Sequence, residues 1–183
     1  MKTISTLLIA AVFVIWQPLH AHSQNTSSNY IEPGYQLTPL LGSAGSFIEI
    51  EAGRQLSGGF SFGGVVHFLV SDINRSAGNL NESMSSLWYA GPRFQYSSEL
   101  NESLSYYGGS TIGIGSTNYQ ETEFDLSTSG GFLIGIRPEI GIRYQLSDIL
   151  RINLGANLFY GHINSRSNIT GVPALRVGFR LGR

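Results

Sequence analysis

A histidine and a serine near the end of the chain could act as base and nucleophile. His162 is followed three residues later by Ser165, in the stretch His-Ile-Asn-Ser. A serine nucleophile needs its base within hydrogen-bond reach, and the base needs a third group that orients it. In an extended segment these two side chains point to opposite faces, and no acidic residue follows Asp148. The sequence therefore predicts no catalytic residues, and we expect the protein not to be an enzyme.

Metal binding is a second chemistry that the side chains could offer. Glu121, Glu123 and Asp125 alternate along one segment, and carboxylate oxygens suit hard cations. Their spacing lacks the pattern of a Ca²⁺ loop, so a solvated acidic loop is the favoured interpretation. His67 and His162 lie in different segments, and two histidines without further ligands do not form a metal site. The chain has no cysteine. We expect neither a metal nor a cofactor.

Ion pairing is the third chemistry that the side chains could offer. Nine charged residues lie on the same face of segments that alternate apolar and polar residues, so they could pair with one another. They share their faces with Gly, Ser and Gln, and no lysine follows Lys2. Crowded guanidinium groups need carboxylate partners and small neighbours. One of the nine is Glu32, and the other eight form the candidate lumenal charge network: Glu49, Glu51, Arg93, Arg137, Glu139, Arg143, Arg176 and Arg180.

The segments that carry these charges alternate apolar and polar residues with a period of two, which is typical of β-strands. The clearest is 131–146, where Ile134, Ile136 and Ile140 share one face and Arg137 and Glu139 the other. The weakest are the first and the fifth. Eight such segments are predicted: 31–38, 48–53, 60–70, 88–96, 104–115, 131–146, 151–161 and 175–182.

Connection lengths indicate how these strands are joined. Short connections are expected around 54–57, 97–103 and 147–150, and they alternate with the longer, polar segments 71–87, 116–130 and 162–172. Tight turns at one end and large loops at the other are typical of an outer-membrane barrel. The predicted fold is therefore all-β, an eight-stranded antiparallel up-and-down transmembrane β-barrel.

A lipocalin-like soluble barrel has the same strand count but buries its apolar face. Apart from the first and last residue of each predicted strand, the apolar face carries no charged residue, and the opposite face carries five Arg and four Glu. A soluble barrel would mix such charges with Lys, Asp, Thr and Asn on its exterior. The near balance of charges among small residues favours a crowded lumen and an apolar exterior. The alternative is that the charges form an ordinary solvated sheet face.

The first residues have the features of an export signal. Lys2 precedes an apolar run over 4–16, which is too short to span a membrane as a helix, and small residues surround Ser23. We expect a cleavable secretory signal peptide over 1–23 and a single barrel domain over 24–183.

Composition excludes several classes of protein. The chain has 23 glycines and only 13% charged residues, which is unlike an ordinary soluble enzyme. Lys+Arg 11 against Asp+Glu 12 gives no basic surplus, so no nucleic-acid partner is expected. Hydrophobic residues make up 42% and aromatic residues 11%, which argues against disorder.

Aromatic residues fall near the ends of the predicted strands. Rings of amphipathic aromatic side chains mark the two interfaces of a membrane, although aromatic residues favour strands in any case. The candidate aromatic girdle comprises Phe68, Trp88, Phe132 and Tyr160 beside the long loops, and Tyr96, Tyr106, Tyr144 and Phe179 beside the short turns.

Two stretches, YAGPRFQY (89–96) and RPEIGIRYQLSDILRINLGANLFYG (137–161), resemble small outer-membrane β-barrel proteins of the OmpA/OmpX-like "porin family". In that family a Pro-Glu-Ile-Gly strand runs through a Ser-Asp turn into a Leu-rich strand. The resemblance implies an integral, multi-pass protein of the bacterial outer membrane, with membrane lipid as its surroundings and the barrel-assembly machinery and periplasmic chaperones as partners during biogenesis. Many members end in an aromatic residue, whereas here Leu181, Gly182 and Arg183 follow Phe179.

Eight strands leave an interior that side chains about fill. The resulting expectation is a structural or surface-interaction role, with an extracellular ligand bound by the loops 71–87, 116–130 and 162–172. One alternative is a narrow gated pore for water, ions or small solutes. A second is a lipid A deacylase-like enzyme, but that family carries His-x-Ser-Asn, and the serine here falls one place late.

Overall fold

The structure, a computed structural model, describes residues 27–40, 43–77, 80–123, 126–128, 131–163 and 168–182. The predicted signal peptide lies outside these residues. The elements are β1 (Ser28–Leu40), β2 (Ser43–Gln55), the 3₁₀ turn η1 (Ser57–Gly59), β3 (Phe60–Leu69), β4 (Ile73–Ala77), β5 (Leu80–Glu99), β6 (Leu104–Glu123), β7 (Leu126–Thr128), β8 (Phe132–Gln145), β9 (Leu150–Ile163) and β10 (Asn168–Gly182). Among the described residues, no helix is long and apolar enough to cross a membrane.

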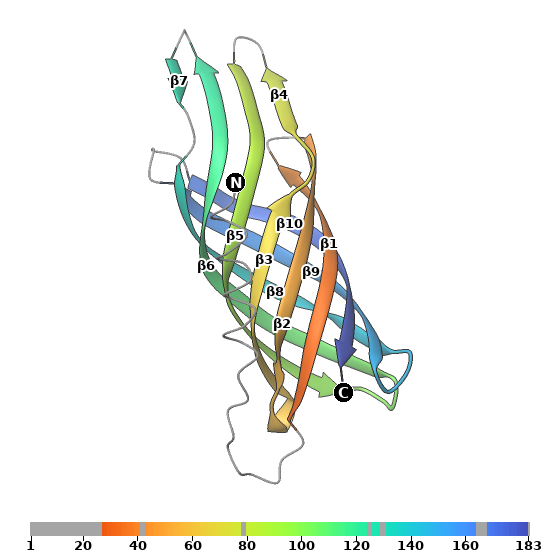
Figure 1. Ribbon diagram of the computed structural model, residues 1–183. Coiled ribbons are helices and arrows are strands. Elements are labelled where there is room, and N and C mark those ends of the chain that lie inside the picture. Colours follow the sequence, from red (N-terminus) through yellow and green to blue (C-terminus); the bar gives the residue numbers. More distant parts are fainter. Residues whose placement is uncertain are drawn as a thin grey trace.

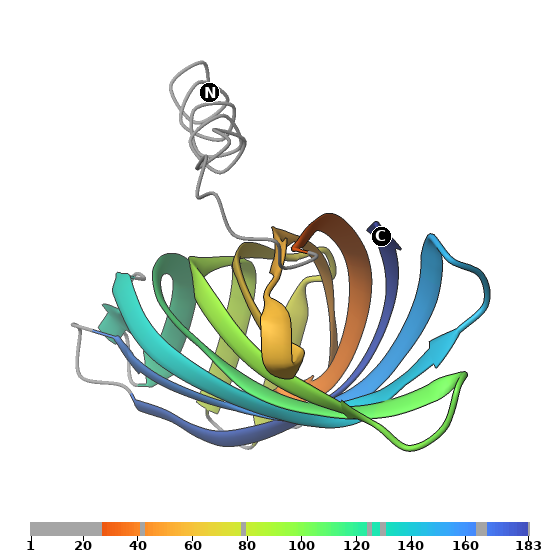
Figure 2. The same cartoon turned by 90° about the horizontal axis from the view of Figure 1, so that it is seen from below.

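Ten strands form one antiparallel sheet in the order β4-β5-β3-β2-β1-β10-β9-β8-β6-β7, and the pairing of β5 with β6 closes it. The short strands β4 and β7 are additions at the ends, so eight strands make the closed wall (Figures 1 and 2). The first and last strands pair with each other, from Tyr30 beside Gly182 to Leu37 beside Leu175. Closure leaves no free edge in the wall. The predicted eight-stranded up-and-down barrel is confirmed.

Side chains alternate between the two faces of the wall, with the apolar set outside. On β8, Leu133 is fully buried while Ile134 is 52% exposed, and Arg137 and Glu139 are buried between exposed neighbours. The same alternation leaves Leu154 of β9 exposed. Interior charges and an exposed apolar exterior are the reverse of a lipocalin-like barrel.

The predicted long loops over 71–87 and 116–130 are the main difference from the sequence-based expectation. Much of each is strand: β5 and β6 run past the barrel wall and pair with each other out to Asn81 and Thr122. Two short strands, β4 and β7, pair on either side of them. Most of the residues in these extensions are polar, so the period-two pattern of apolar residues does not detect them.

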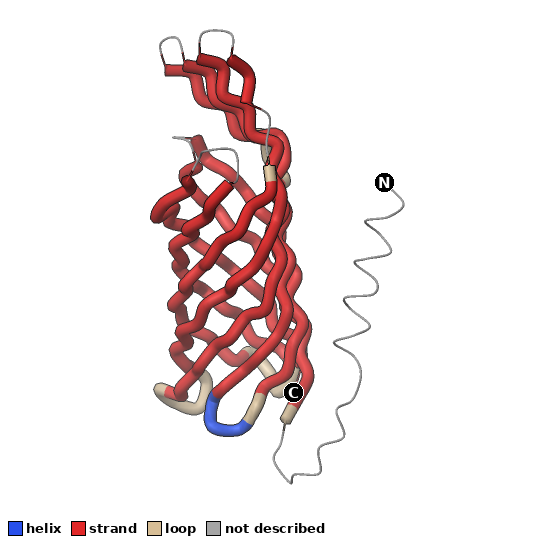
Figure 3. Tube along the Cα trace, turned by 90° about the vertical axis from the view of Figure 1, so that its left-hand side faces the viewer, coloured by secondary structure: helices blue, strands red, loops and turns tan. Residues whose placement is uncertain are grey.

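We call this four-stranded extension the projecting sheet: β4, β5 before Trp88, β6 after Gly115, and β7. Figure 3 shows it standing beyond the rest of the barrel at one end. The opposite, short-turn end carries the turns at 56–59, 100–103 and 146–149. One of these turns depends on Gly59, which has φ of +85° and whose Cβ would collide with the Ser97 carbonyl.

Candidate functional site

The lumen of the barrel holds a compact cluster of ionised side chains. They come from β1, β2, β5, β8 and β10, which are brought together because the wall closes on itself. All are buried, and the structure brings the eight predicted network residues into this interior together with Glu32. The buried set is Glu32, Glu49, Glu51, Arg93, Arg137, Glu139, Arg143, Arg176 and Arg180.

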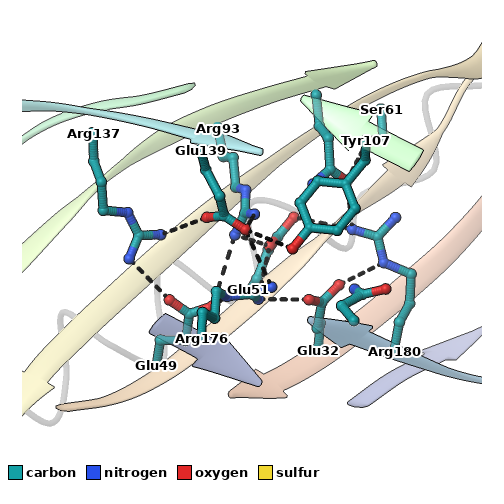
Figure 4. A network of polar contacts seen from close by, with 12 residues as sticks. Glu32, Glu49, Glu51, Ser61, Arg93, Tyr107, Arg137, Glu139, Arg176 and Arg180 are labelled. Atoms are coloured by element: carbon teal, nitrogen blue, oxygen red, sulfur yellow. Dashed lines mark hydrogen bonds and ion pairs between the residues drawn. The ribbon is translucent and has the colours of Figure 1, made fainter. Parts of the chain in front are cut away.

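Arg176 of β10 lies at the centre of the cluster (Figure 4). Its Nε donates to Glu49. Its Nη2 donates to Glu32 Oε1 at 2.5 Å, and its Nη1 lies 3.5 Å from Glu139 Oε1. A guanidinium has five N–H donors in a fixed plane, which lets one Arg join carboxylates from three different strands.

Two further arginines extend the cluster across the lumen. Arg93 of β5 donates to Glu51 Oε2 at 2.7 Å and to Glu139 Oε1 at 2.8 Å. Arg137 of β8 donates to Glu49 Oε2 at 3.0 Å. Glu139 therefore lies between Arg93 of β5 and Arg176 of β10, and Glu49 between Arg137 of β8 and Arg176. The network ties non-adjacent strands together, which backbone pairing cannot do.

Neutral polar residues that sequence analysis did not single out complete the network. Tyr30 donates its hydroxyl to Glu51 Oε1 at 2.5 Å, and Tyr107 donates to Glu139 Oε1 at 2.9 Å. Gln36 accepts a hydrogen bond from Arg137 at 2.8 Å. All three lie on the inward face of their strands. Alternation gives that placement, but it does not say which partner each side chain reaches.

Arg143 is bonded differently from the other four arginines. Its Nε donates to Asn153 Oδ1 at 2.8 Å and its Nη2 to Gln95 Oε1 at 2.8 Å. Its guanidinium carbon lies 5.4 Å from the centre of the Tyr107 ring. No carboxylate of the described residues lies within 4.0 Å of this guanidinium. Arg143 is thus in the predicted cluster without being part of its ion pairing.

Three of the carboxylates approach one another closely enough to suggest a cation site. One oxygen from each of Glu32, Glu49 and Glu51 lies within 4.8 Å of the others. Guanidinium groups already occupy the space between them, because Arg176 bonds the first two and Arg93 the third. The arrangement neutralises these carboxylates internally, and its chemistry is that of an ion-pair network.

Beside the charge network, toward the projecting sheet, the lumen is filled by apolar side chains, which we call the apolar plug. Two of them, Met84 and Leu87, come from the base of that sheet. Sequence analysis did not predict it, although its members lie on the inward face as occasional apolar residues among small ones. The plug consists of Phe47, Met84, Leu87, Tyr89, Leu133 and Ile163, with Leu69, Phe159 and Val172 packed against it. Tyr89 and Phe159 contact each other edge to face, with their ring centroids 5.3 Å apart.

A cavity of about 30 Å³ separates the plug from the charge network. Gln36, His67 and Arg137 line it on the polar side, and Phe47 and Phe159 on the apolar side. His67 Nδ1 lies 3.1 Å from Glu49 Oε2, so this buried histidine contacts the network. The space is enough for only a few water molecules. The described lumen is therefore occluded by two successive layers.

The predicted girdle residues lie on the outer wall. Seven are exposed, and Phe68 is half-buried. Register places Phe68 beside Trp88, and Trp88 across Ser116 from Phe132, in one row near the projecting sheet. At the other end, Phe60 stacks on Tyr96 at 5.1 Å between ring centroids and was not predicted.

The remaining candidate residues cannot be assembled into a site. Ser165, the possible nucleophile, lies outside the described residues, and His162 has an exposed side chain. Of the acidic trio, Asp125 is outside the described residues, while Glu121 and Glu123 lie on the outer part of β6. The predictions of no catalytic site, no metal and no cofactor stay predictions.

No protein-family model matches this sequence, and no curated protein matches it. Solved structures do. Neisserial surface protein A has 15% identity and a TM-score of 0.57, covering 85% of this chain and 96% of its own. The N-terminal β-barrel domain of Pseudomonas aeruginosa OprF has 13% identity and a TM-score of 0.52, covering 86% and 100%.

A third similar structure is the attachment invasion locus protein Ail of Yersinia pestis, determined in complex with the heparin analogue sucrose octasulfate. It has 12% identity and a TM-score of 0.51, covering 88% of this chain and 100% of its own. At these identities the likeness concerns the fold. The architecture of this chain is that of small outer-membrane β-barrels.

Proposed function

We propose that this chain is an integral protein of the bacterial outer membrane that contacts other molecules through its projecting sheet. The observation that carries the proposal is the extension of β5 and β6 beyond the barrel, flanked by β4 and β7. A lumen filled by ion pairs and an apolar plug leaves the outer wall and the projecting sheet as the surfaces available for function.

The outer wall supports the membrane part of the proposal. Its side chains include many exposed large apolar residues, among them Ile112, Ile140 and Leu175. A continuous apolar belt of this kind is unfavourable in water and favourable in lipid. A chain in lipid also needs a closed sheet that leaves no unpaired backbone group, as this wall does. Outer-membrane lipid is then the permanent partner of the wall. Export, periplasmic chaperones and the barrel-assembly machinery would bring the chain there.

The projecting sheet supports the contact part of the proposal. Its outer strands, β4 and β7, each pair on one side only among the described residues. An exposed strand edge presents N–H and C=O groups that can pair with an extended segment of another protein. The chain between residues 71 and 130 that lies outside the wall carries one basic residue, Arg75, and five acidic ones. We therefore infer a neutral or basic protein partner and not a sulfated polyanion.

Shortening the projecting sheet should abolish binding while the barrel still forms. In the variant, 72–83 and 118–130 are each replaced by a four-residue Asn/Gly turn, which keeps the plug residue Met84. Cells that display the wild-type protein are expected to adhere to a surface coated with a single basic protein. Adhesion of cells that display the variant should be at least about tenfold lower, because the variant lacks most of the acidic side chains and both strand edges of the projecting sheet. An acidic-protein coat is the second probe.

The matched control replaces the turn 146–149 at the opposite end of the barrel with another four-residue turn. It should leave adhesion unchanged. Both variants must still migrate as folded barrels in unheated detergent gels. Equal adhesion of wild type and the shortened variant on every coat would refute the surface-contact role while leaving the membrane assignment intact.

The alternative role as a narrow pore makes an opposite prediction for conductance. A water path would require both the ion pairs around Arg176 and the packed plug residues to move apart. Because these two layers lie in series, we expect no single-channel current above background in planar bilayers holding the refolded protein. Stepwise, voltage-independent currents would support the pore instead.

We also propose that the chain has no lipid-modifying activity. His162 and Ser165 fall on opposite faces if the strand continues, and no carboxylate follows in the sequence to orient the histidine. Loss of acyl chains from lipid A upon expression, abolished by His162→Ala, would overturn this proposal.

A further inference from the structure

Three arginines line the lumen on adjacent strands at the short-turn end of the barrel. Arg143 lies on β8, Arg151 on β9 and Arg180 on β10. Arg151 and Arg180 are register partners, and Arg143 faces Asn153. Like charges directly opposite each other on neighbouring strands destabilise a sheet. This end of the lumen therefore concentrates positive charge.

Among the described residues, only one of the three forms ion pairs with carboxylates within 4.0 Å. Arg180 donates to Glu32 Oε2 at 2.6 Å and lies 3.6 Å from Glu51. Within the part of the chain that the structure describes, neither Arg143 nor Arg151 has a carboxylate within 4.0 Å. Counting the whole buried cluster, five arginines face four glutamates. The excess charge belongs to Arg143, which is only 4% exposed. A buried charge without a counter-ion is costly.

Hydrogen bonding around Arg143 and Arg180 is also incomplete, because N–H donors there lack acceptors. Arg143 and Arg180 both donate to the same acceptor, Gln95 Oε1, at 2.8 and 2.9 Å. Arg180 Nη1 and Gln95 Nε2 then have no acceptor, although their side chains are only 1% and 3% exposed. Buried donors without acceptors are uncommon in folded proteins. The guanidinium groups of Arg143 and Arg180 and the amide of Gln95 thus lie together where no carboxylate of the described chain pairs with Arg143.

We propose that Arg143, Arg180 and Gln95 bind a small inorganic anion, such as a halide, phosphate or sulfate. The anion would supply both the missing charge and the missing acceptor. It would enter from the short-turn end, where Gln145 and Arg151 are partly exposed. This site lies at the end of the barrel opposite the projecting sheet, so anion binding does not require the partner of that sheet.

Thermal unfolding of the refolded protein in nonionic detergent tests the site. Sodium chloride, bromide, phosphate and sulfate are each compared with sodium gluconate, which is too large to enter, at equal ionic strength. Binding to the folded state alone should raise Tm saturably, by about 3–5 °C at ten times the dissociation constant. The halide and oxyanion arms identify which kind of anion the site prefers.

Arg143→Gln should lose the anion-dependent rise, and its Tm in gluconate should equal or exceed that of wild type, because the uncompensated charge is gone. Arg137→Gln is the matched control: it breaks an ion pair with Glu49, so its Tm falls in every salt, yet it keeps the anion-dependent rise. If Arg143→Gln does not fold, Arg151→Gln serves instead, and it should raise the half-saturating anion concentration severalfold. No difference between gluconate and any other anion in wild type, or an undiminished rise in the Arg143 or Arg151 variant that folds, would overturn the proposal.

Discussion

Replacing Arg176 by methionine is expected to destabilise the barrel by about 3–5 kcal/mol, the cost typical of breaking a buried ion pair from one side. Methionine keeps most of the side-chain volume, so packing changes little. The loss arises because Glu32, Glu49 and Glu139 stay buried and each loses a guanidinium partner. Because these carboxylates lie on β1, β2 and β8, the effect should appear in unfolding of the whole barrel.

Equilibrium unfolding in urea from lipid vesicles measures this effect. Trp88 is the only tryptophan after the expected signal peptide, so its fluorescence reports the transition. Arg143→Met, measured in gluconate, is the matched control and should stay within about 1 kcal/mol of wild type, since it breaks no ion pair. Adding Glu49→Gln to Arg176→Met should recover part of the loss. If Arg176→Met unfolds at the wild-type urea concentration, the lumenal network does not stabilise the fold.

The barrel and its orientation could be predicted from the sequence because both follow from one local property. Lipid outside and a crowded lumen inside force opposite chemistry on successive residues, and this appears directly as a period of two. The segment 131–146 shows it most clearly, and β8 spans Phe132–Gln145. Placing Arg137 and Glu139 inside needed only that alternation, without knowledge of any partner.

Strand ends were less predictable for the same reason. Once β5 and β6 leave the wall, neither face contacts lipid, so the alternation stops although backbone pairing continues to Asn81 and Thr122. Composition there resembles a polar loop. The centre of the projecting sheet is specified by pairing between β5 and β6, from Leu87 beside Thr117 to Asn81 beside Thr122, and a pattern within either segment does not contain that information.

Side-chain partners inside the lumen were unpredictable for a geometric reason. The carboxylate that Arg176 reaches depends on the tilt of the strands and on the stagger in register where the barrel closes. Together these place Arg176 of β10 within hydrogen-bond distance of both Glu32 and Glu49. The apolar plug needs the same information: Phe47 and Ile163 are isolated inward apolar residues on β2 and β9 that meet only after closure. Glycines leave room for other large lumenal side chains: a Cβ at Gly135 would lie 3.0 Å from the Phe159 ring, and one at Gly155 would collide with the Tyr107 hydroxyl.

Replacing Ile112 by arginine is the second change with a large expected effect, and it tests which solvent the wall faces. Ile112 is 53% exposed on β6, between the girdle residue Tyr106 and the position where Ser116 pairs with Trp88. That location is near the middle of the apolar belt. A charged residue on the lipid face at mid-depth costs about 2–4 kcal/mol, falling to about 0–1 kcal/mol at the interface.

Leu181→Arg is the matched control, because Leu181 is 44% exposed near the short-turn end of β10. Both variants are refolded into lipid vesicles and compared by urea unfolding, with Trp88 as the probe. The difference between the two positions carries the argument: a wall in water would accept either arginine equally, since both sites are about half exposed. A cost that is the same at Ile112 and Leu181 would mean that the apolar belt faces no hydrocarbon. A cost that is large only at Ile112 requires a solvent whose polarity changes along the barrel axis, which is the property that distinguishes a membrane from water.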